Sequence, residues 1–128
     1  NKVQLALDGM KVFNFALNEV PPNVRALLEH KGKTIDDPDF FIFHQANYLI
    51  NESIRKKLKI SPEKYPYSIR QFGNTSSASI VLGMVTAIRE SLLSKPNQIV
   101  LAGFGVGLSW GSVYMDCDPL VIPPLVEI

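Results

Sequence analysis

The sequence predicts a layered α/β domain with a mixed sheet and crossover helices. Apolar residues recur at helical spacing in several stretches, while two short runs between or after them are wholly apolar. Residues 108–115 alternate in the manner of a strand and follow a glycine-rich turn. Strands that are separated by helical stretches pair through crossovers, so the helices are expected to cover the sheet and the last two strands to form a hairpin.

The first part of the chain is predicted to hold two helices and a strand. An apolar stripe predicts a helix over about residues 9–20 that ends at Pro21 and Pro22, because proline lacks a backbone N–H and clashes with the preceding turn. A second helix over about residues 22–31 resumes the stripe. The apolar run Phe40–Phe43 is predicted to be a short buried strand.

The middle of the chain is predicted to be a helix followed by a connection. An apolar stripe after His44 predicts a helix to about Lys59, with its basic residues off the stripe. Residues 61–72 have little periodicity and contain prolines, which indicates a loop. We expect one short strand in it, near Tyr67–Gln71.

The last part is predicted to contain one more helix and a hairpin. A tight turn at Gly73–Ser79 leads into a helix that is capped by Thr75 or Ser76 and ends near Leu93. The apolar run 99–102 and the alternating run 108–115 are the two strands of the hairpin. We therefore divide the chain into a folded unit, residues 1–116, and a proline-rich tail, residues 117–128, that cannot continue a central strand.

Composition excludes several classes of protein. The chain has 128 residues, 46% of them hydrophobic and 20% charged, which is typical of one globular domain. Its formal net charge of +1 creates no general field for nucleic acid or an anionic membrane. A single cysteine, Cys117, and two histidines predict no internal disulfide and no metal site, and a cytoplasmic setting is expected. The chain begins at Asn1 without a signal segment, and we expect it to be a piece of a larger protein.

His44 and Asn74 are the candidate chemical residues. His44 stands at the predicted carboxyl end of a strand, where open α/β sheets bind ligands, and can transfer a proton or bind a developing oxyanion. Asn74 precedes a helix in a loop of small residues, where an amide donor suits an oxyanion hole. The alternatives are a histidine satisfied at the rim of the core and an asparagine that only holds a turn.

Two further stretches have a less specific meaning. Gly103–Gly111 lacks a third glycine at Leu108 and joins two strands, so dinucleotide binding is excluded in favour of a hairpin whose N–H groups face a ligand. The basic residues between Arg55 and Lys59 are either a solvated helix face or a docking site for an acidic partner or a phosphate. Cys117 has no nearby base and is interpreted as structural or incidental.

Three ordered motifs together resemble a known family. They are His-Gln-Ala-Asn at 44–47, Gly-Asn-Thr-Ser-Ser-Ala-Ser at 73–79 and Gly-Phe-Gly-Val-Gly-Leu-Ser-Trp-Gly at 103–111. They resemble the C-terminal half of β-ketoacyl-acyl-carrier-protein synthase III, over about Leu5 to Asp116. The resemblance implies the C-terminal half of a thiolase-like fold, with the nucleophilic cysteine on an N-terminal half that is absent from this chain.

The resemblance also implies an activity. The family joins an acyl group from acyl-CoA to malonyl-acyl-carrier-protein, releases carbon dioxide and needs no cofactor, so the isolated chain is expected to be inactive. His44 and Asn74 match the pair that binds the malonyl thioester oxygen. The backbone N–H of Val106 matches part of a second oxyanion hole, and Phe104 matches an aromatic neighbour of the acyl pocket. A side chain at Val106, where the family often has glycine, is expected to narrow that pocket.

The remaining implications concern partners. Gln45, Lys56 and Lys57 match positions that dock the carrier protein, whereas Leu49 replaces a family arginine there. A homodimer is expected, as is self-association of the isolated half through its uncovered apolar face. Two alternatives stay open: a condensing enzyme of secondary metabolism, and a module that binds a carrier protein without catalysis.

Overall fold

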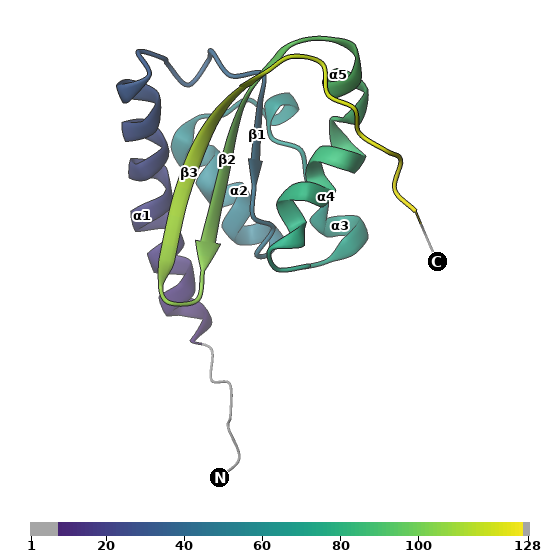
Figure 1. The fold of residues 1–128 in the computed structure, drawn as a ribbon. Helices are drawn as coiled ribbons and strands as arrows, with labels where there is room; N and C mark the ends of the chain where they lie inside the picture. Colours follow the sequence, from purple (N-terminus) through teal and green to yellow (C-terminus); the bar gives the residue numbers. More distant parts are fainter. Residues whose placement is uncertain (1–7, 127–128) are drawn as a thin grey trace.

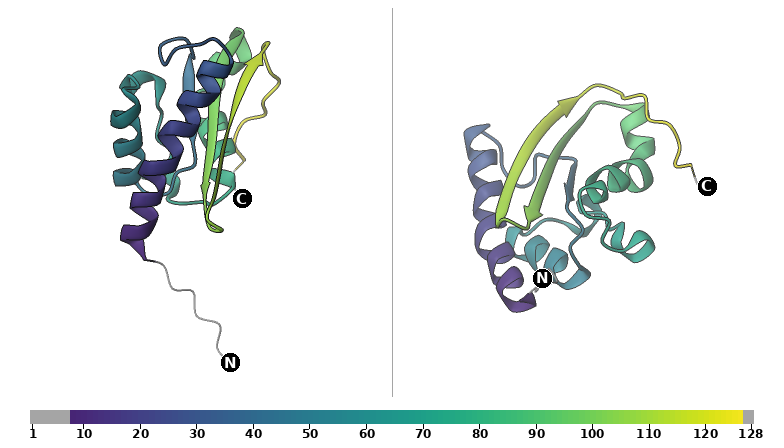
Figure 2. Two further views of the ribbon diagram at one scale, coloured as in Figure 1. Left: turned by 90° about the vertical axis from the view of Figure 1, so that its left-hand side faces the viewer. Right: turned by 60° about the horizontal axis from the view of Figure 1, so that its bottom comes forward.

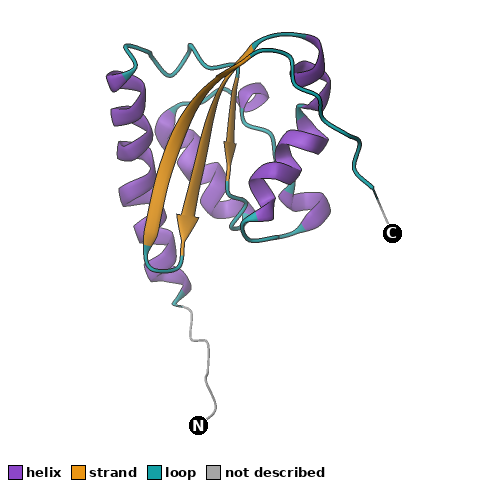
Figure 3. Cartoon of the chain, in the orientation of Figure 1, coloured by secondary structure: helices purple, strands orange, loops and turns teal. Residues whose placement is uncertain are grey.

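The computed structural model describes residues 8–126; the expected start of the resemblance at Leu5 and the last two residues of the tail lie outside this range. Figures 1 and 3 show the elements along the chain. The elements are α1 (Gly9–His30), β1 (Phe40–Phe43), α2 (Tyr48–Leu58), the 3-10 turn η1 (Pro62–Lys64), α3 (Ile69–Phe72), α4 (Ala78–Ala87), α5 (Arg89–Ser94), β2 (Asn97–Gly105) and β3 (Ser109–Cys117).

The sheet is mixed, as predicted. Its strands lie in the order β1-β2-β3, with β1 parallel to β2 and β2 antiparallel to β3. Phe43, the last residue of β1, lies opposite Ala102, so the carboxyl ends of β1 and β2 point to the same edge of the sheet. The hairpin between β2 and β3 extends beyond that edge, and Gly105 pairs with Ser109 at its tip.

Helices cover both faces of the sheet (Figure 2). On one face α1 and α2 pack on Phe41 and Phe43, and on the other α4 and α5 pack on Ile42. This division follows from the alternation of side chains along a strand. Gly83 of α4 lets that helix approach β1 closely, because a Cβ there would lie 3.0 Å from the Ile42 side chain.

The predicted break at Pro21 and Pro22 is wrong, because α1 runs through both prolines. Without an N–H on Pro21, the carbonyl of Leu17 lacks its helical donor. The Lys57 ammonium on α2 donates to that carbonyl at 2.8 Å. Packing against α2 therefore supplies the hydrogen bond that the proline removes, and one helix forms where the sequence predicts two.

Two other predicted elements differ from the structure. The expected strand at Tyr67–Gln71 is absent from the described residues, and α3 occupies most of that range. Tyr67 is fixed instead by its hydroxyl, which donates to Glu52 at 2.6 Å. The expected single helix to Leu93 is divided at Ile88, whose φ of −125° and ψ of 12° end α4 and turn its side chain into the apolar cluster.

The tail, predicted to begin at residue 117, begins one residue later in the structure, because Cys117 is the last residue of β3 and pairs with Asn97. From residue 118 the chain leaves β3 and crosses the face of α5, where the backbone N–H of Leu120 donates to Leu92 at 2.7 Å. The Arg89 guanidinium also donates to the carbonyl of Ile122 at 2.8 Å. Within residues 8–126, no helix has both the length and the apolar character that crossing a membrane requires.

Candidate active site

The carboxyl ends of β1 and β2 open on a cavity of about 890 Å³. Its wall is built by the residue after β1, the turn before α4, the first turn of α4, the β2–β3 hairpin and the start of α1. Four of the predicted site residues line it together: His44, Asn74, Phe104 and Val106. These residues are up to 62 positions apart in the chain. The parallel pairing of β1 with β2 brings His44 and the hairpin residues to one edge, and Asn74 joins them through its bond to the Ala46 carbonyl.

His44 is held as a continuation of β1. Its backbone N–H donates to the carbonyl of Ala102 at 2.8 Å, so the residue stays in the plane of the sheet. The imidazole packs edge-on against the Phe104 ring, with 5.3 Å between the ring centroids. Nδ1 lies 3.1 Å from the carbonyl oxygen of Ser76 and 2.8 Å from the hydroxyl oxygen of Ser79. Nε2 is therefore the ring nitrogen left for a ligand in the cavity.

The protonation of His44 follows from this setting. Burial lowers the pKa of the imidazole below its usual value, because the charged ring loses water. The hydrogen bond to the Ser76 carbonyl raises the pKa and offsets part of that effect. Near neutral pH the ring is mainly uncharged in the absence of a ligand.

The Asn74 amide has a fixed orientation. Its Oδ1 accepts the backbone N–H of Ser76 at 2.9 Å, and its Nδ2 donates to the carbonyl of Ala46 at 3.1 Å. A backbone N–H can only donate and a carbonyl can only accept, so the two ends of the amide cannot be exchanged. Nδ2 carries two hydrogens, and one of them remains for a ligand in the cavity.

The turn that carries Asn74 differs from its prediction. Neither Thr75 nor Ser76 caps α4. The cap residue is Ser77, whose side chain makes no capping hydrogen bond within residues 8–126. The reason is that Ser76 has a left-handed φ of 55° and gives its N–H to Asn74. Gly73 supplies a positive φ of 68° before it, which glycine adopts without strain.

A buried polar network supports the turn after β1, and sequence reasoning missed it. The Asn51 side chain, fully buried on α2, accepts the backbone N–H of Ala46 at 3.1 Å and donates to the carbonyl of His44 at 2.9 Å. It also donates to the buried Tyr65 hydroxyl at 3.1 Å. The only sequence signal was a polar residue one turn after Asn47, which does not distinguish a buried amide from an exposed one.

Gln45 is not a docking residue in this structure. Its side chain is 2% exposed, donates to the carbonyl of Phe43 at 3.0 Å and accepts the backbone N–H of Ile69 at 3.3 Å. The prediction fails because the residue after His44 points inward and ties β1 to α3.

The predicted hairpin residues lie on the cavity wall. Phe104 is nearly buried against His44, whereas the Val106 side chain is 77% exposed at the hairpin tip. The Ser109 hydroxyl donates to the Val106 carbonyl at 2.8 Å and shapes the turn. Gly107, with φ of 138°, occupies a conformation that favours glycine.

The basic residues of α2 divide into anchored and accessible cations. Arg55 forms a two-pronged pair with Glu52, at 2.9 and 2.7 Å, and lowers the pKa of that carboxyl to about 2 together with the Tyr67 hydroxyl. Lys57 is held by the Leu17 carbonyl. Lys56 stays 69% exposed, 3.4 Å from Glu52. Of the predicted docking residues, Lys56 thus has the most accessible charge.

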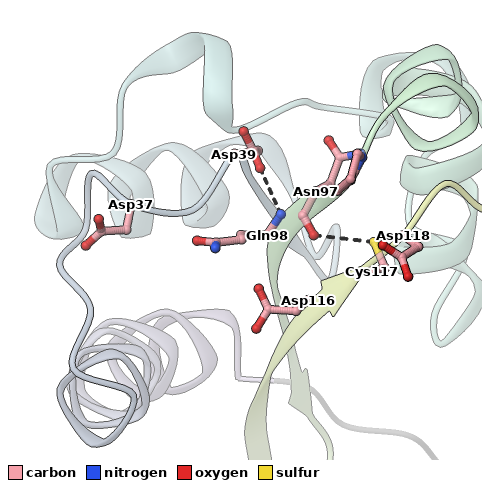
Figure 4. A pocket seen from close by; sticks show the side chains of 8 residues that line it. Asp37, Asp39, Asn97, Gln98, Asp116, Cys117 and Asp118 are labelled. Atoms are coloured by element: carbon pink, nitrogen blue, oxygen red, sulfur yellow. Dashed lines mark hydrogen bonds between the residues drawn. The ribbon is translucent and has the colours of Figure 1, made fainter.

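A second cavity, of about 510 Å³, lies at the opposite end of the sheet (Figure 4). Asp37, Asp39, Asp116 and Asp118 surround it. Asp39 accepts the backbone N–H of Gln98 at 2.8 Å, and Cys117 contacts the Asn97 carbonyl at 3.5 Å. Among residues 8–126 no group of acidic, histidine or cysteine side chains is arranged to hold a metal ion.

The mixed sheet between two helical layers, with a histidine and an asparagine at the carboxyl ends of its parallel strands, has the thiolase-like fold of condensing enzymes. The family described as 3-oxoacyl-acyl-carrier-protein (ACP) synthase III C terminal matches residues 28–117. The chain belongs to this family.

Relatives in sequence are similar over most of the chain. A β-ketoacyl-acyl-carrier-protein synthase III from Oceanobacillus iheyensis is 40% identical over 109 residues, which are 85% of this chain and 35% of the relative. The enzyme of the same name from Clostridium novyi is 39% identical over 109 residues, 85% of this chain and 34% of the relative. The chain therefore spans about a third of the length of these relatives.

Solved structures agree with the sequence relatives. A 3-oxoacyl-(acyl-carrier protein) synthase from Burkholderia xenovorans superposes with a TM-score of 0.86 at 40% identity, covering 89% of this chain and 33% of the other. A priming β-ketosynthase from a polyketide biosynthetic pathway has a TM-score of 0.74 at 31% identity, covering 90% and 35%.

Proposed function

We propose that this chain is the C-terminal catalytic part of a decarboxylating condensing enzyme, an acyltransferase that joins an acyl group to malonyl-acyl-carrier-protein at the start of fatty acid synthesis. The observation that carries the proposal is the meeting of His44 and Asn74 at one cavity. Nδ1 of His44 is tied to the Ser76 carbonyl and leaves Nε2 for a ligand, whereas the Asn74 amide is tied to the backbone at both ends and keeps one spare N–H.

The chemistry needs such a pair. A cysteine on the N-terminal half takes the acyl group from acyl-CoA. In the malonyl thioester, the bond between the carboxylate and the α-carbon then breaks, carbon dioxide leaves and the electron pair forms an enolate. The α-carbon attacks the cysteine thioester, and the cysteine sulfur leaves. Donors held in place by the protein stabilise the enolate oxygen, and we assign this role to the spare N–H of Asn74 and to Nε2 of His44 when that nitrogen carries a proton.

The β2–β3 hairpin contributes a hydrogen-bond donor for the acyl thioester and one wall of the acyl pocket. The backbone N–H of Val106 binds the oxygen of the acyl thioester, and Phe104 borders the acyl pocket. Both residues line the same cavity as His44, which supports this assignment. The Val106 side chain stands free at the hairpin tip, where it narrows the space for an acyl group.

The partners follow from the same proposal. Acidic malonyl-carrier protein docks on α2 through Lys56, with Lys57 as a neighbour whose charge is partly engaged by Leu17. The whole enzyme is a cytoplasmic homodimer. Apolar side chains such as Val81 and Val113 are exposed in this chain, which supports the proposal that another protein surface covers them in the whole enzyme.

The test uses the intact protein with its cysteine half. His44→Ala is expected to lower the condensation rate about 100-fold or more, because one oxyanion donor is lost, while acyl-CoA still acylates the cysteine. Condensation and acylation are measured separately with labelled substrates. Condensation by His44→Ala at the parental rate would contradict the proposal, and so would steady product formation by these 128 residues alone.

A condensing enzyme of secondary metabolism is a second candidate. The likeness to a priming ketosynthase of a polyketide pathway favours it. The two candidates share the His44–Asn74 chemistry and differ in the acyl group they accept. Comparing short acyl-CoA substrates with the intact enzyme separates them.

A further inference from the structure

Ser79 is a buried residue beside the candidate catalytic histidine, and its hydroxyl contacts three neighbouring groups. It lies in the first turn of α4 and is 1% exposed. Its hydroxyl donates to the Ser76 carbonyl at 2.8 Å and accepts the backbone N–H of Gln45 at 3.1 Å. The same oxygen lies 2.8 Å from Nδ1 of His44.

The hydrogens in this cluster decide the protonation of the ring. The Ser79 hydroxyl has one hydrogen, and the Ser76 carbonyl receives it, so Oγ faces Nδ1 as an acceptor. The Ser76 carbonyl also faces Nδ1, at 3.1 Å, and can only accept. Two acceptors opposite one ring nitrogen favour a hydrogen on that nitrogen.

We propose that Ser79 is a positioning residue that, with the Ser76 carbonyl, keeps a proton on Nδ1 of His44 and directs Nε2 into the cavity. The inference rests on the condensing activity proposed above. A ring with a proton on Nδ1 has a bare Nε2 when neutral and an Nε2–H only when it is an imidazolium. His44 then stabilises the enolate as a cation, through a charge-assisted hydrogen bond.

The groups around the ring set its pH dependence. The His44 ring contacts the Phe104 ring on β2, the Ser76 carbonyl and the Ser79 hydroxyl, and none of these three groups is charged. In the intact protein the nucleophilic cysteine is the further titratable group at this site. Burial holds the pKa of His44 below its usual value. The donor form is present below that pKa and is lost as the pH rises through it.

The first test is a double-mutant comparison in the intact enzyme. Decarboxylation of malonyl-carrier protein is measured, because this step forms no bond to the cysteine. Ser79→Ala is expected to lower kcat about tenfold with KM within about twofold, less than the roughly 100-fold cost of losing a donor outright. In the His44→Ala background the same change is expected to have less than a twofold effect, since Ser79 acts through the ring.

The matched control is Ser94→Ala. Ser94 is an exposed serine on α5 whose hydroxyl also donates to a helical carbonyl, that of Glu90, at 2.7 Å. Its replacement is expected to leave decarboxylation unchanged. Acylation of the cysteine by acyl-CoA reports whether each variant is folded.

The second test is the pH profile. The parental rate is expected to fall as the pH rises through the pKa of His44, which lies below its usual value of 6.5. In Ser79→Ala this fall is expected to move to lower pH, because an acceptor for Nδ1–H is lost. Independently of any variant, nitrogen-15 NMR of the His44 ring in the intact protein is expected to find the proton of the neutral ring on Nδ1.

The outcomes separate the two proposals. A parental rate in His44→Ala overturns the proposed function. If His44→Ala strongly lowers the rate, the proposed function stands and the present inference is tested separately. The inference is overturned by any of three results: an equal effect of Ser79→Ala in both backgrounds, a rate that does not change with pH, or a neutral His44 ring protonated on Nε2.

Discussion

At the carboxyl ends of β1 and β2, polar side chains are tied to the backbone and still leave hydrogen-bonding groups for a cavity. Asn74 illustrates this, because its amide is fixed at both ends and keeps a spare N–H. At the amino ends of the same strands, a second cavity is lined by four carboxylates. Two of them are used to hold backbone: Asp39 accepts the N–H of Gln98, and Asp37 accepts from Thr34.

The difference between the two ends shows what makes a cavity a candidate site. The acidic end has more charge, but the hydrogen bonds of Asp37 lower the pKa of its carboxyl and keep it engaged with its own loop. The other end has little charge, but its donors converge from β1 and from the turn before α4. Convergence of donors suits an enolate, whereas carboxylates that hold their own backbone, as Asp37 and Asp39 do, suit a structural role. Among residues 8–126 these carboxylates are not arranged to hold a metal ion.

The largest expected effect is at Asn74. Replacing it with Asp in the intact enzyme keeps the shape, removes the amide donors and adds a negative charge beside the enolate. Decarboxylation is expected to fall about 1,000-fold, at the upper end for one oxyanion donor. Asp37→Asn, the reverse exchange at the opposite cavity, is the control and is expected to change the rate less than about twofold. An Asn74→Asp enzyme with more than a tenth of the parental rate would remove the distinction between the two ends.

The next prediction concerns the stability of the fold beneath the candidate site, at Asn51. Asn51→Leu has similar volume but removes the hydrogen bonds that Asn51 makes with the N–H of Ala46, the carbonyl of His44 and the Tyr65 hydroxyl. The free energy of unfolding is expected to fall by about 3 kcal/mol, because buried polar groups lose their hydrogen bonds. Urea unfolding followed by circular dichroism measures it.

The control for Asn51 is Asn18→Leu on the exposed side of α1, which is expected to change the same free energy by less than about 0.5 kcal/mol. Equal losses in the two variants would show that the network does not support the turn after β1.

Local sequence patterns predicted the parts of the fold that depend on neighbours in the chain. The four apolar residues Phe40–Phe43, followed by His44, were enough to predict β1 and to place the histidine directly after its end. Alternation predicted β3, and the motif around Asn74 predicted a turn that opens a helix. The meeting of His44 with Asn74 came from the resemblance to a family, because no local pattern measures a distance across 30 residues.

The predictions that failed depend on distant contacts. Pro21 ends a helix in isolation, but here the ammonium of Lys57 satisfies the carbonyl that the proline leaves free. The family resemblance predicts Gln45 on the docking surface, but its side chain is buried because it bonds to both β1 and α3. Ser79 is the last residue of the motif at 73–79, and the sequence predicts no role for it because its role depends on where the His44 ring points.

The smallest expected change, a loss of stability, is at Asp39, and it tests the role of the acidic cavity at the amino ends of β1 and β2. Asp39→Ala leaves the backbone N–H of Gln98 without its 2.8 Å partner at the start of β2. The free energy of unfolding is expected to fall by about 1 kcal/mol, the usual net value of one such bond. Asp118→Ala, on the same cavity wall and exposed, is expected to cost less than about 0.5 kcal/mol. Neither change is expected to alter decarboxylation by the intact enzyme, since both lie at the end of the sheet away from His44. A loss of activity in Asp39→Ala beyond its loss of stability would mean that the two ends are coupled, and the acidic cavity would then have a part in the reaction.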